Sequence, residues 1–160
     1  MKKLCTALSA SLGVFFLFSA AFAASPEPKS PQAKQVKAMV DKAAALVDRK
    51  GDSAFPEFKK KGGKWFKGDA YIIVGDMKGK NIVNAAFPEF EGKNVLDLKD
   101  PDGKPIVQSF IDAVKTKDSG WVEYLWPKPG ETKPAKKFTY VKKAKLAEEN
   151  VYVGAGFYAE

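Results

Sequence analysis

Apolar residues recur at helical spacing in the first part of the chain. Between residues 31 and 49 one face collects Val36, Met39, Val40, Ala43, Ala44, Leu46 and Val47. Ser30 is suited to cap this helix, Pro31 to enter its first turn, and Gly51 to end it. The pattern predicts a long helix, followed by a short second helix around Phe55.

Further along, strands dominate the pattern, because apolar positions alternate or run together between turn residues. Two strands joined at 76–80 predict a hairpin, and an amphipathic helix is predicted over 105–117. The predicted strands cover residues 70–74, 81–85, 120–126, 136–146 and 150–158. This order of elements predicts an α+β domain: a five-stranded antiparallel sheet with helices packed on one face.

The first residues have the pattern of a secretory signal peptide. Lys2 and Lys3 precede an apolar run, and Ala21-Phe22-Ala23 supplies a small-x-small cleavage site. We therefore expect a cleaved signal peptide over 1–23, a proline-rich spacer over 24–31 and one domain over 32–160. This predicts a soluble protein exported to the periplasm, and an uncleaved anchor is the alternative.

Composition restricts the chemistry available to the exported chain. The sequence contains no histidine, and its one cysteine, Cys5, lies in the signal region. Ser-His-Asp and Cys-His catalysis therefore lack an essential group, and zinc, haem and iron–sulfur sites lack their usual ligands. We expect no enzyme activity, no metal and no cofactor.

Two other features have ordinary interpretations. Asp100-Pro101-Asp102-Gly103 lacks the acidic residues that a calcium loop needs at its first and twelfth positions, so it predicts a turn. Lysines give a formal net charge of +8, but acidic residues are interspersed with them. We expect a solvated face that attracts small anions and binds no nucleic acid.

The segment from Gly120 to Pro129 concentrates two tryptophans and a tyrosine. Strand alternation places Val122, Tyr124 and Trp126 on one face, and Trp121 on the other. The following strand carries Lys137 and Tyr140. A lysine, a tyrosine hydroxyl and aromatic walls together suit a small carboxylate. Core packing explains the aromatic residues equally well, but explains Lys137 less well.

Several segments together resemble the single-Cache (type 2) extracellular sensor domains. They are Asp69–Asp76 with Gly79, Pro88–Val95, Asp97–Pro105, Gly120–Pro129, Lys137–Lys142 and Val153–Tyr158. The resemblance extends from about Val36 to Tyr158. It implies a PAS-like sheet preceded by a long helix, and a small organic acid such as acetate or pyruvate bound on that sheet.

Members of this family usually sit outside the membrane in chemoreceptors and histidine kinases. We expect a stand-alone exported member. Many relatives carry a histidine before a proline where this chain has Asn84, which donates a hydrogen bond without charge.

The leading hypothesis is a periplasmic protein that binds a short-chain carboxylate and reports to a membrane histidine kinase or chemoreceptor. The walls of its expected site are Tyr71, Tyr124 and Trp126. Lys137 supplies the positive charge, and Tyr140 and Asn84 supply hydrogen bonds. The alternative is a ligand-free interaction or dimerisation module of a periplasmic signalling or transport system. There the apolar stripe of the long helix would form a homodimer or dock a partner.

Overall fold

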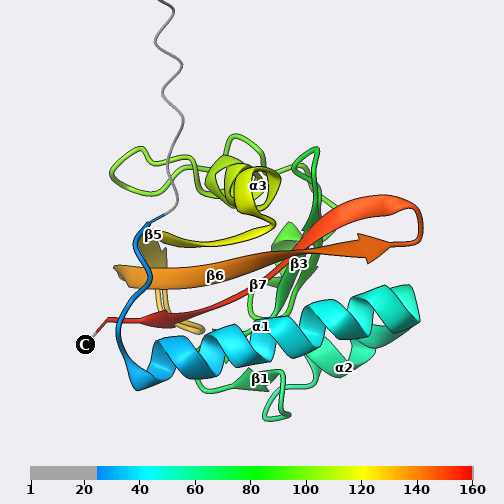
Figure 1. The fold of residues 1–160 in the computed structure, drawn as a ribbon. Helices are drawn as coiled ribbons and strands as arrows, with labels where there is room; N and C mark the ends of the chain where they lie inside the picture. Colours follow the sequence, from blue (N-terminus) through cyan, green and yellow to red (C-terminus); the bar gives the residue numbers. More distant parts are fainter. Residues whose placement is uncertain (1–24, 160) are drawn as a thin grey trace, which may run out of the picture.

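A five-stranded antiparallel sheet forms the centre of the computed structural model, which describes residues 25–159 (Figure 1). The predicted signal peptide lies outside the described residues. The strand order is β4-β3-β7-β6-β5. The strands are β3 (Ile73–Asp76), β4 (Asn81–Asn84), β5 (Ser119–Pro127), β6 (Pro134–Leu146) and β7 (Glu149–Tyr158). The predicted α+β fold is confirmed, and so is its five-stranded PAS-like sheet.

The long N-terminal helix is also confirmed. The Ser30 side chain caps it by accepting a hydrogen bond of 3.0 Å from the backbone N–H of Ala33, and Gly51 ends it with a φ of 59°. Apart from the helices α1 and α3, the remaining elements are short. They are α1 (Pro31–Lys50), η1 (Gly51–Ala54), α2 (Phe55–Lys59), β1 (Phe66–Lys67), β2 (Ala70–Tyr71), η2 (Pro88–Phe90) and α3 (Ile106–Lys117).

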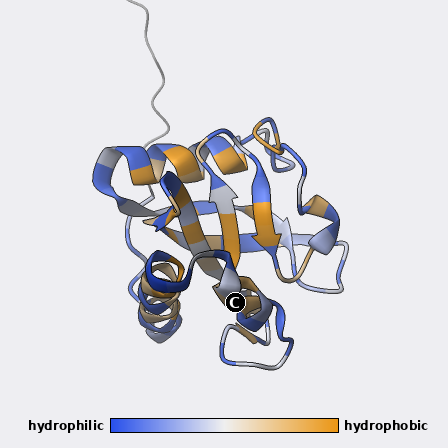
Figure 2. Cartoon of the chain, turned by 90° about the vertical axis from the view of Figure 1, so that its right-hand side faces the viewer, coloured by the Kyte–Doolittle hydropathy of each residue, from blue (hydrophilic) through white to orange (hydrophobic). Residues whose placement is uncertain are grey.

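Helices cover the sheet in two layers. The helices α1 and α2 pack on one face, and α3 packs on the opposite face (Figure 1). Each strand supplies both layers, because successive side chains point to opposite sides. Trp121 packs in the α1 layer, whereas Val122 and Tyr124 pack in the α3 layer. Hydrophobic positions lie on strands of the sheet and on parts of the helices that cover it (Figure 2).

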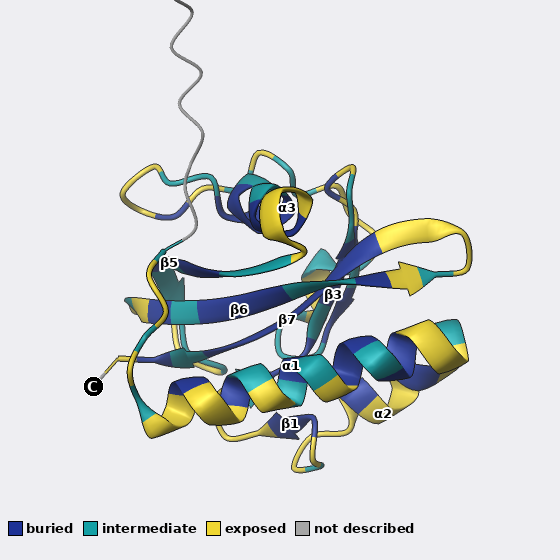
Figure 3. Cartoon of the chain, in the orientation of Figure 1, coloured by how far each residue is buried: buried dark blue, intermediate teal, exposed yellow. Residues whose placement is uncertain are grey.

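The apolar stripe of α1 is buried against the sheet. Val36, Val40, Ala43 and Val47 are each less than 5% exposed, and the outer side of the helix is exposed (Figure 3). Among residues 25–159, no helix is both long and apolar enough to cross a membrane.

The outer strands of the sheet have their backbone groups occupied. On β5, Ser25 bonds the carbonyl of Trp121 and the N–H of Glu123, at 2.7 and 3.0 Å. Lys104 donates to the carbonyl of Glu123, and Asp100 accepts from Leu125. Asp100 also accepts from two N–H groups of its own loop, which confirms the predicted turn.

The outer edge of β4 is held in a similar way. The Asn81 N–H donates to the carbonyl of Lys93 at 2.9 Å, and its carbonyl accepts from Gly92 at 2.8 Å. Neither outer strand therefore presents a continuous row of free backbone groups.

Close packing across β6 and β7 requires a glycine at position 156. A Cβ at Gly156 would lie 2.8 Å from the Cε of Lys137 and 2.7 Å from the carbonyl oxygen of Phe138. Such contacts are too short for carbon. The bare backbone of Gly156 therefore leaves the space through which the Lys137 side chain passes.

We expect Gly156→Ala to lower the free energy of unfolding by about 1–3 kcal/mol, because the added methyl group overpacks this crossing. Urea denaturation measures the change. Thr132→Ala, in an exposed turn, is the control and should stay within about 0.5 kcal/mol of the wild type. An unchanged stability for Gly156→Ala would contradict the close approach.

Candidate ligand-binding site

Four of the predicted site residues line one cavity on the α3 side of the sheet. Tyr71, Asn84, Tyr124 and Trp126 surround a space of about 30 Å³. Apolar side chains of α3 and of the preceding loop close it, including Leu98, Ile106, Val107 and Phe110. The predicted placement of Tyr124 and Trp126 on the pocket face of β5 agrees with this arrangement.

Lys137 contacts Tyr71, one of the residues that line this cavity. The strand register places it directly between Tyr124 and Tyr158, so the three side chains share one face. Its Nζ atom is 2.7 Å from the Tyr71 hydroxyl. The same atom lies 4.0 Å from the centre of the Tyr71 ring and 5.0 Å from that of Tyr158. Tyrosine side chains thus surround the amine.

Lys137 is 2% exposed and forms no ion pair with any residue between 25 and 159. Burial lowers the pKa of its ammonium group to about 7, and the negative charge of Asp69 opposes this shift. A buried cation without a partner costs several kcal/mol, and an anion placed beside it would offset part of that cost.

The surrounding tyrosines remain neutral hydrogen-bonding groups. Burial raises the pKa of Tyr71 well above its ordinary value, and burial also raises the pKa of Tyr124. The Tyr124 hydroxyl lies 3.0 Å from the hydroxyl of Thr139. The Tyr71 hydroxyl is therefore available to donate to an anion beside Lys137.

Asn84 holds the loop that covers the cavity. Its side-chain oxygen accepts a hydrogen bond of 3.1 Å from the N–H of Phe87, and its own N–H donates to Glu91 at 2.9 Å. The rings of Phe87 and Phe90 lie 5.6 and 5.8 Å from Trp126. The rings of Phe87, Phe90 and Trp126 form an aromatic cover over the cavity. Asn84 therefore lines the cavity and also positions this cover.

Tyr140 is not brought together with the other five residues. It lies on the α1 face, where its ring centre is 5.2 Å from that of Trp121 and 5.1 Å from the Nζ of Lys37. Lys137 and Tyr140 are three positions apart on one strand, so alternation sends them to opposite faces. The expectation that both side chains contact one ligand did not take this alternation into account.

Sequence reasoning missed three aromatic residues of the site: Tyr158, Phe87 and Phe90. Tyr158 was accessible from the sequence, because the register of the β6–β7 hairpin places it opposite Lys137. The two phenylalanines lie in a loop region without periodicity, and no signal in the sequence assigns them to the cover.

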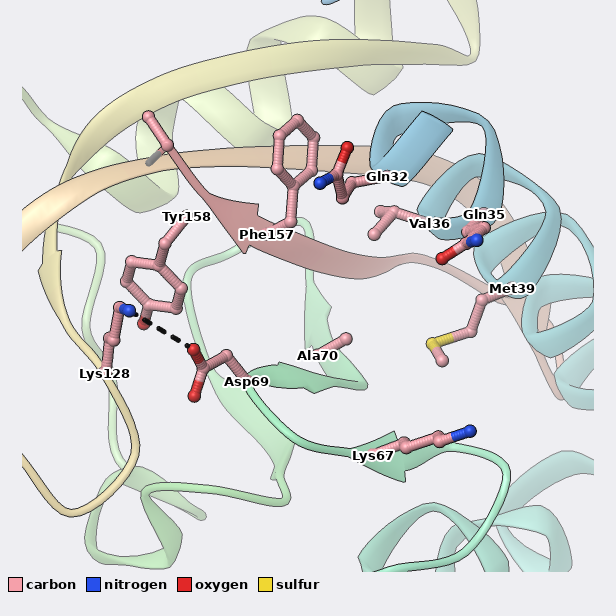
Figure 4. A pocket seen from close by; sticks show the side chains of 11 residues that line it. Gln32, Gln35, Val36, Met39, Lys67, Asp69, Ala70, Lys128, Phe157 and Tyr158 are labelled. Carbon is pink, nitrogen blue, oxygen red and sulfur yellow. Dashed lines mark ion pairs between the residues drawn. The ribbon is translucent and has the colours of Figure 1, made fainter. Parts of the chain in front are cut away.

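A larger hollow of about 360 Å³ lies beyond Tyr158, between α1 and the β1–β2 hairpin (Figure 4). Gln32, Lys67 and Phe157 line it, and Lys128 approaches Asp69 to 3.6 Å at its edge. None of the six predicted residues lines this hollow. Lys137 lines neither space: its neighbour Tyr158 lines the hollow, and its hydrogen-bond partner Tyr71 lines the smaller cavity. Because four of the predicted residues line the smaller cavity, we assign the candidate site there.

Residues 59–160, more than half of the chain, match the family model of the Cache domain. Two curated relatives each align over 58% of this chain. They are the methyl-accepting chemotaxis protein McpP of Pseudomonas putida, 29% identical, and the sensor histidine kinase MctS of Rhizobium johnstonii, 35% identical. The aligned part is 16% of the first protein and 19% of the second, so the chain spans less than a fifth of either.

A solved structure described as the basis for carboxylic acid recognition by a Cache chemosensory domain has a similar fold. It is 25% identical, with a TM-score of 0.69 over 81% of this chain and 94% of the other.

We expect Lys137→Met to raise the free energy of unfolding at pH 7 by about 1–4 kcal/mol, because methionine fills the space without a charge. Wild-type stability should rise by about 1 kcal/mol per pH unit between pH 7 and 9, since the unfolded chain keeps a lysine proton that the folded chain has lost. Lys137→Met should lack this rise.

Urea denaturation at several pH values measures both effects. Lys136→Met is the matched control, because Lys136 is exposed on the same strand and pairs with Glu123 at 3.0 Å. It should change stability by about 0.5 kcal/mol at most. A Lys137→Met protein less stable than the wild type would contradict the picture of an unpaired buried charge.

Proposed function

Because this chain belongs to the Cache domain family, we propose that it is a periplasmic sensory protein that binds a short-chain carboxylate beside Lys137. The proposed role is recognition without catalysis. The ligand would be a small acid of the acetate or pyruvate type. Its carboxylate would pair with the lysine, and its short tail would enter the cavity under α3.

The observation that carries this proposal is the unpaired amine of Lys137. A domain that needed only a filled core would be better served by an apolar side chain at this position. A carboxylate supplies the missing opposite charge, and the Tyr71 hydroxyl, 2.7 Å from the amine, is placed to donate to the same anion. Aromatic rings exclude water and so strengthen the pairing.

The size of the cavity limits the ligand. Its volume of about 30 Å³ holds one or two water molecules, so even a two-carbon acid requires the walls to move. The aromatic cover is the wall best able to do so. Phe87, Phe90 and Trp126 are only partly buried, whereas Tyr124 and Phe110 on the inner side are 6% and 2% exposed.

The relatives support a signalling role. One is a chemotaxis receptor and one is a sensor histidine kinase, and a similar Cache domain recognises a carboxylic acid. We propose that the bound and free forms are distinguished by a membrane receptor or kinase. The loop of Phe87 and Phe90 is the surface that would differ between them.

The alternative, an interaction module without a ligand, rested on the apolar stripe of the long helix. That stripe packs on the sheet within the domain, so it is not available to a second copy. The small cavity is compatible with this alternative. A module without a ligand, however, gives no reason for burying Lys137, which has no ion-pair partner among residues 25–159. A homodimer through the outer, polar side of α1 stays a prediction that native mass spectrometry checks.

Isothermal titration calorimetry with acetate, propionate and pyruvate tests the proposal, on protein shown by mass spectrometry to be free of ligand. We expect one acid to bind at a single site. Lys137→Met should weaken binding by about 100-fold or more, because the opposite charge is lost. Tyr71→Phe should weaken it by about 10-fold, because one hydrogen bond to a charged group is lost.

Tyr140→Phe is the matched control, since it removes the same hydroxyl from a buried tyrosine on the other face, and it should bind within about twofold of the wild type. Absence of heat with every acid would rule out the carboxylate site. An equal loss in Tyr140→Phe would show that the effect of Tyr71→Phe is not local.

A further inference from the structure

We propose that this site takes up its carboxylate together with a proton from solvent, so that occupancy depends on external pH as well as on ligand concentration. The inference rests on the proposed function and adds a regulation to the same site. It follows from the charges and hydrogen-bonding groups of the side chains that surround Lys137.

The groups that face Lys137 carry almost no compensating charge. Tyr71 faces it from β2, Tyr158 from β7 and Tyr124 from β5. Among residues 25–159, the acidic group that acts on the lysine is Asp69, next to β2. Asp69 is half-exposed and lies 3.6 Å from Lys128, which already balances it (Figure 4). Within residues 25–159, no carboxylate therefore pairs with Lys137 to hold its proton.

The three tyrosines cannot take the place of that anion. Burial raises the pKa of Tyr71, Tyr124 and Tyr158, so all three stay neutral over the pH range in which the lysine titrates. The contact between Nζ and the Tyr71 hydroxyl suits both states of the lysine. The ammonium donates to the phenolic oxygen, and the neutral amine accepts from the phenolic hydroxyl.

When no acid is bound, the lysine loses its proton near pH 7, since burial lowers the pKa of Lys137 to about 7. A carboxylate bound against Nζ favours the charged form and raises this pKa again. Above about pH 7 the binding step therefore joins a carboxylate anion, a neutral amine and one solvent proton into a carboxylate–ammonium pair. Charge is balanced, and no covalent bond to the ligand is made.

This linkage predicts a specific pH profile. Below about pH 6.5 the lysine is already charged, and affinity should be nearly constant while the ligand stays ionised. Above pH 8 the dissociation constant should rise about tenfold per pH unit. Proton uptake should approach one per ligand at pH 8 and fall toward zero at pH 6.

Calorimetry of the ligand-free wild-type protein with acetate tests this at pH 6, 7, 8 and 9. Each pH is measured in two buffers of different ionisation enthalpy, so that the difference in heat counts the protons taken up. A dissociation constant that is flat from pH 6 to 9, with no buffer dependence, would overturn the proton linkage and leave carboxylate binding intact. No binding at any pH would overturn the proposed function, and the linkage with it.

Lys137→Arg supplies a second test, because a guanidinium does not lose its proton in this range. It should bind acetate with little dependence on pH and without buffer-dependent heat. Lys136→Arg, on the exposed side of the same strand, should keep the wild-type profile. An arginine variant that still takes up a proton would assign the proton to another group. Should Lys137→Arg fail to fold, the wild-type buffer series decides alone.

Discussion

The buried amine of Lys137, which forms no ion pair with any residue between 25 and 159, is the constraint on which the arrangement of the site depends. Without a counter-ion, the group relies on the Tyr71 hydroxyl and on the faces of two tyrosine rings. Cation–π contacts of this kind offset only part of the cost of burial. The sheet also gives up a side chain at Gly156 to let the lysine through. These are the features from which we propose an anion site.

The two layers of the domain differ in the side chains that they contain. The α1 layer is built from a buried helix stripe and from the strand residues opposite it, and it contains no titratable group of the site. The α3 layer carries the cavity, the lysine and the partly exposed aromatic cover. The layers are also joined beyond the sheet, because Lys59 of α2 pairs with Glu91, next to Phe90 of the cover, at 2.6 Å.

Local rules predicted most of the fold and part of the site. The cap at Ser30, the end at Gly51 and the alternation along β5 are properties of neighbouring residues, and the structure agrees with each. The prediction that Tyr140 and Lys137 share one site failed, because residues three positions apart on a strand point to opposite faces. Phe87 and Phe90 could not be assigned, because a loop without periodicity takes its place from tertiary contacts such as the Asn84–Phe87 hydrogen bond.

The occupied edges of the sheet restrict how another protein can recognise this domain. Along β5 the outward backbone groups of residues 121–125 are bonded to Ser25, Lys104 and Asp100, and on β4 those of Asn81 are bonded to its own loop. A partner cannot extend the sheet at these positions by adding a strand. Recognition must instead depend on side-chain shape and charge, which a displaced aromatic cover would alter directly.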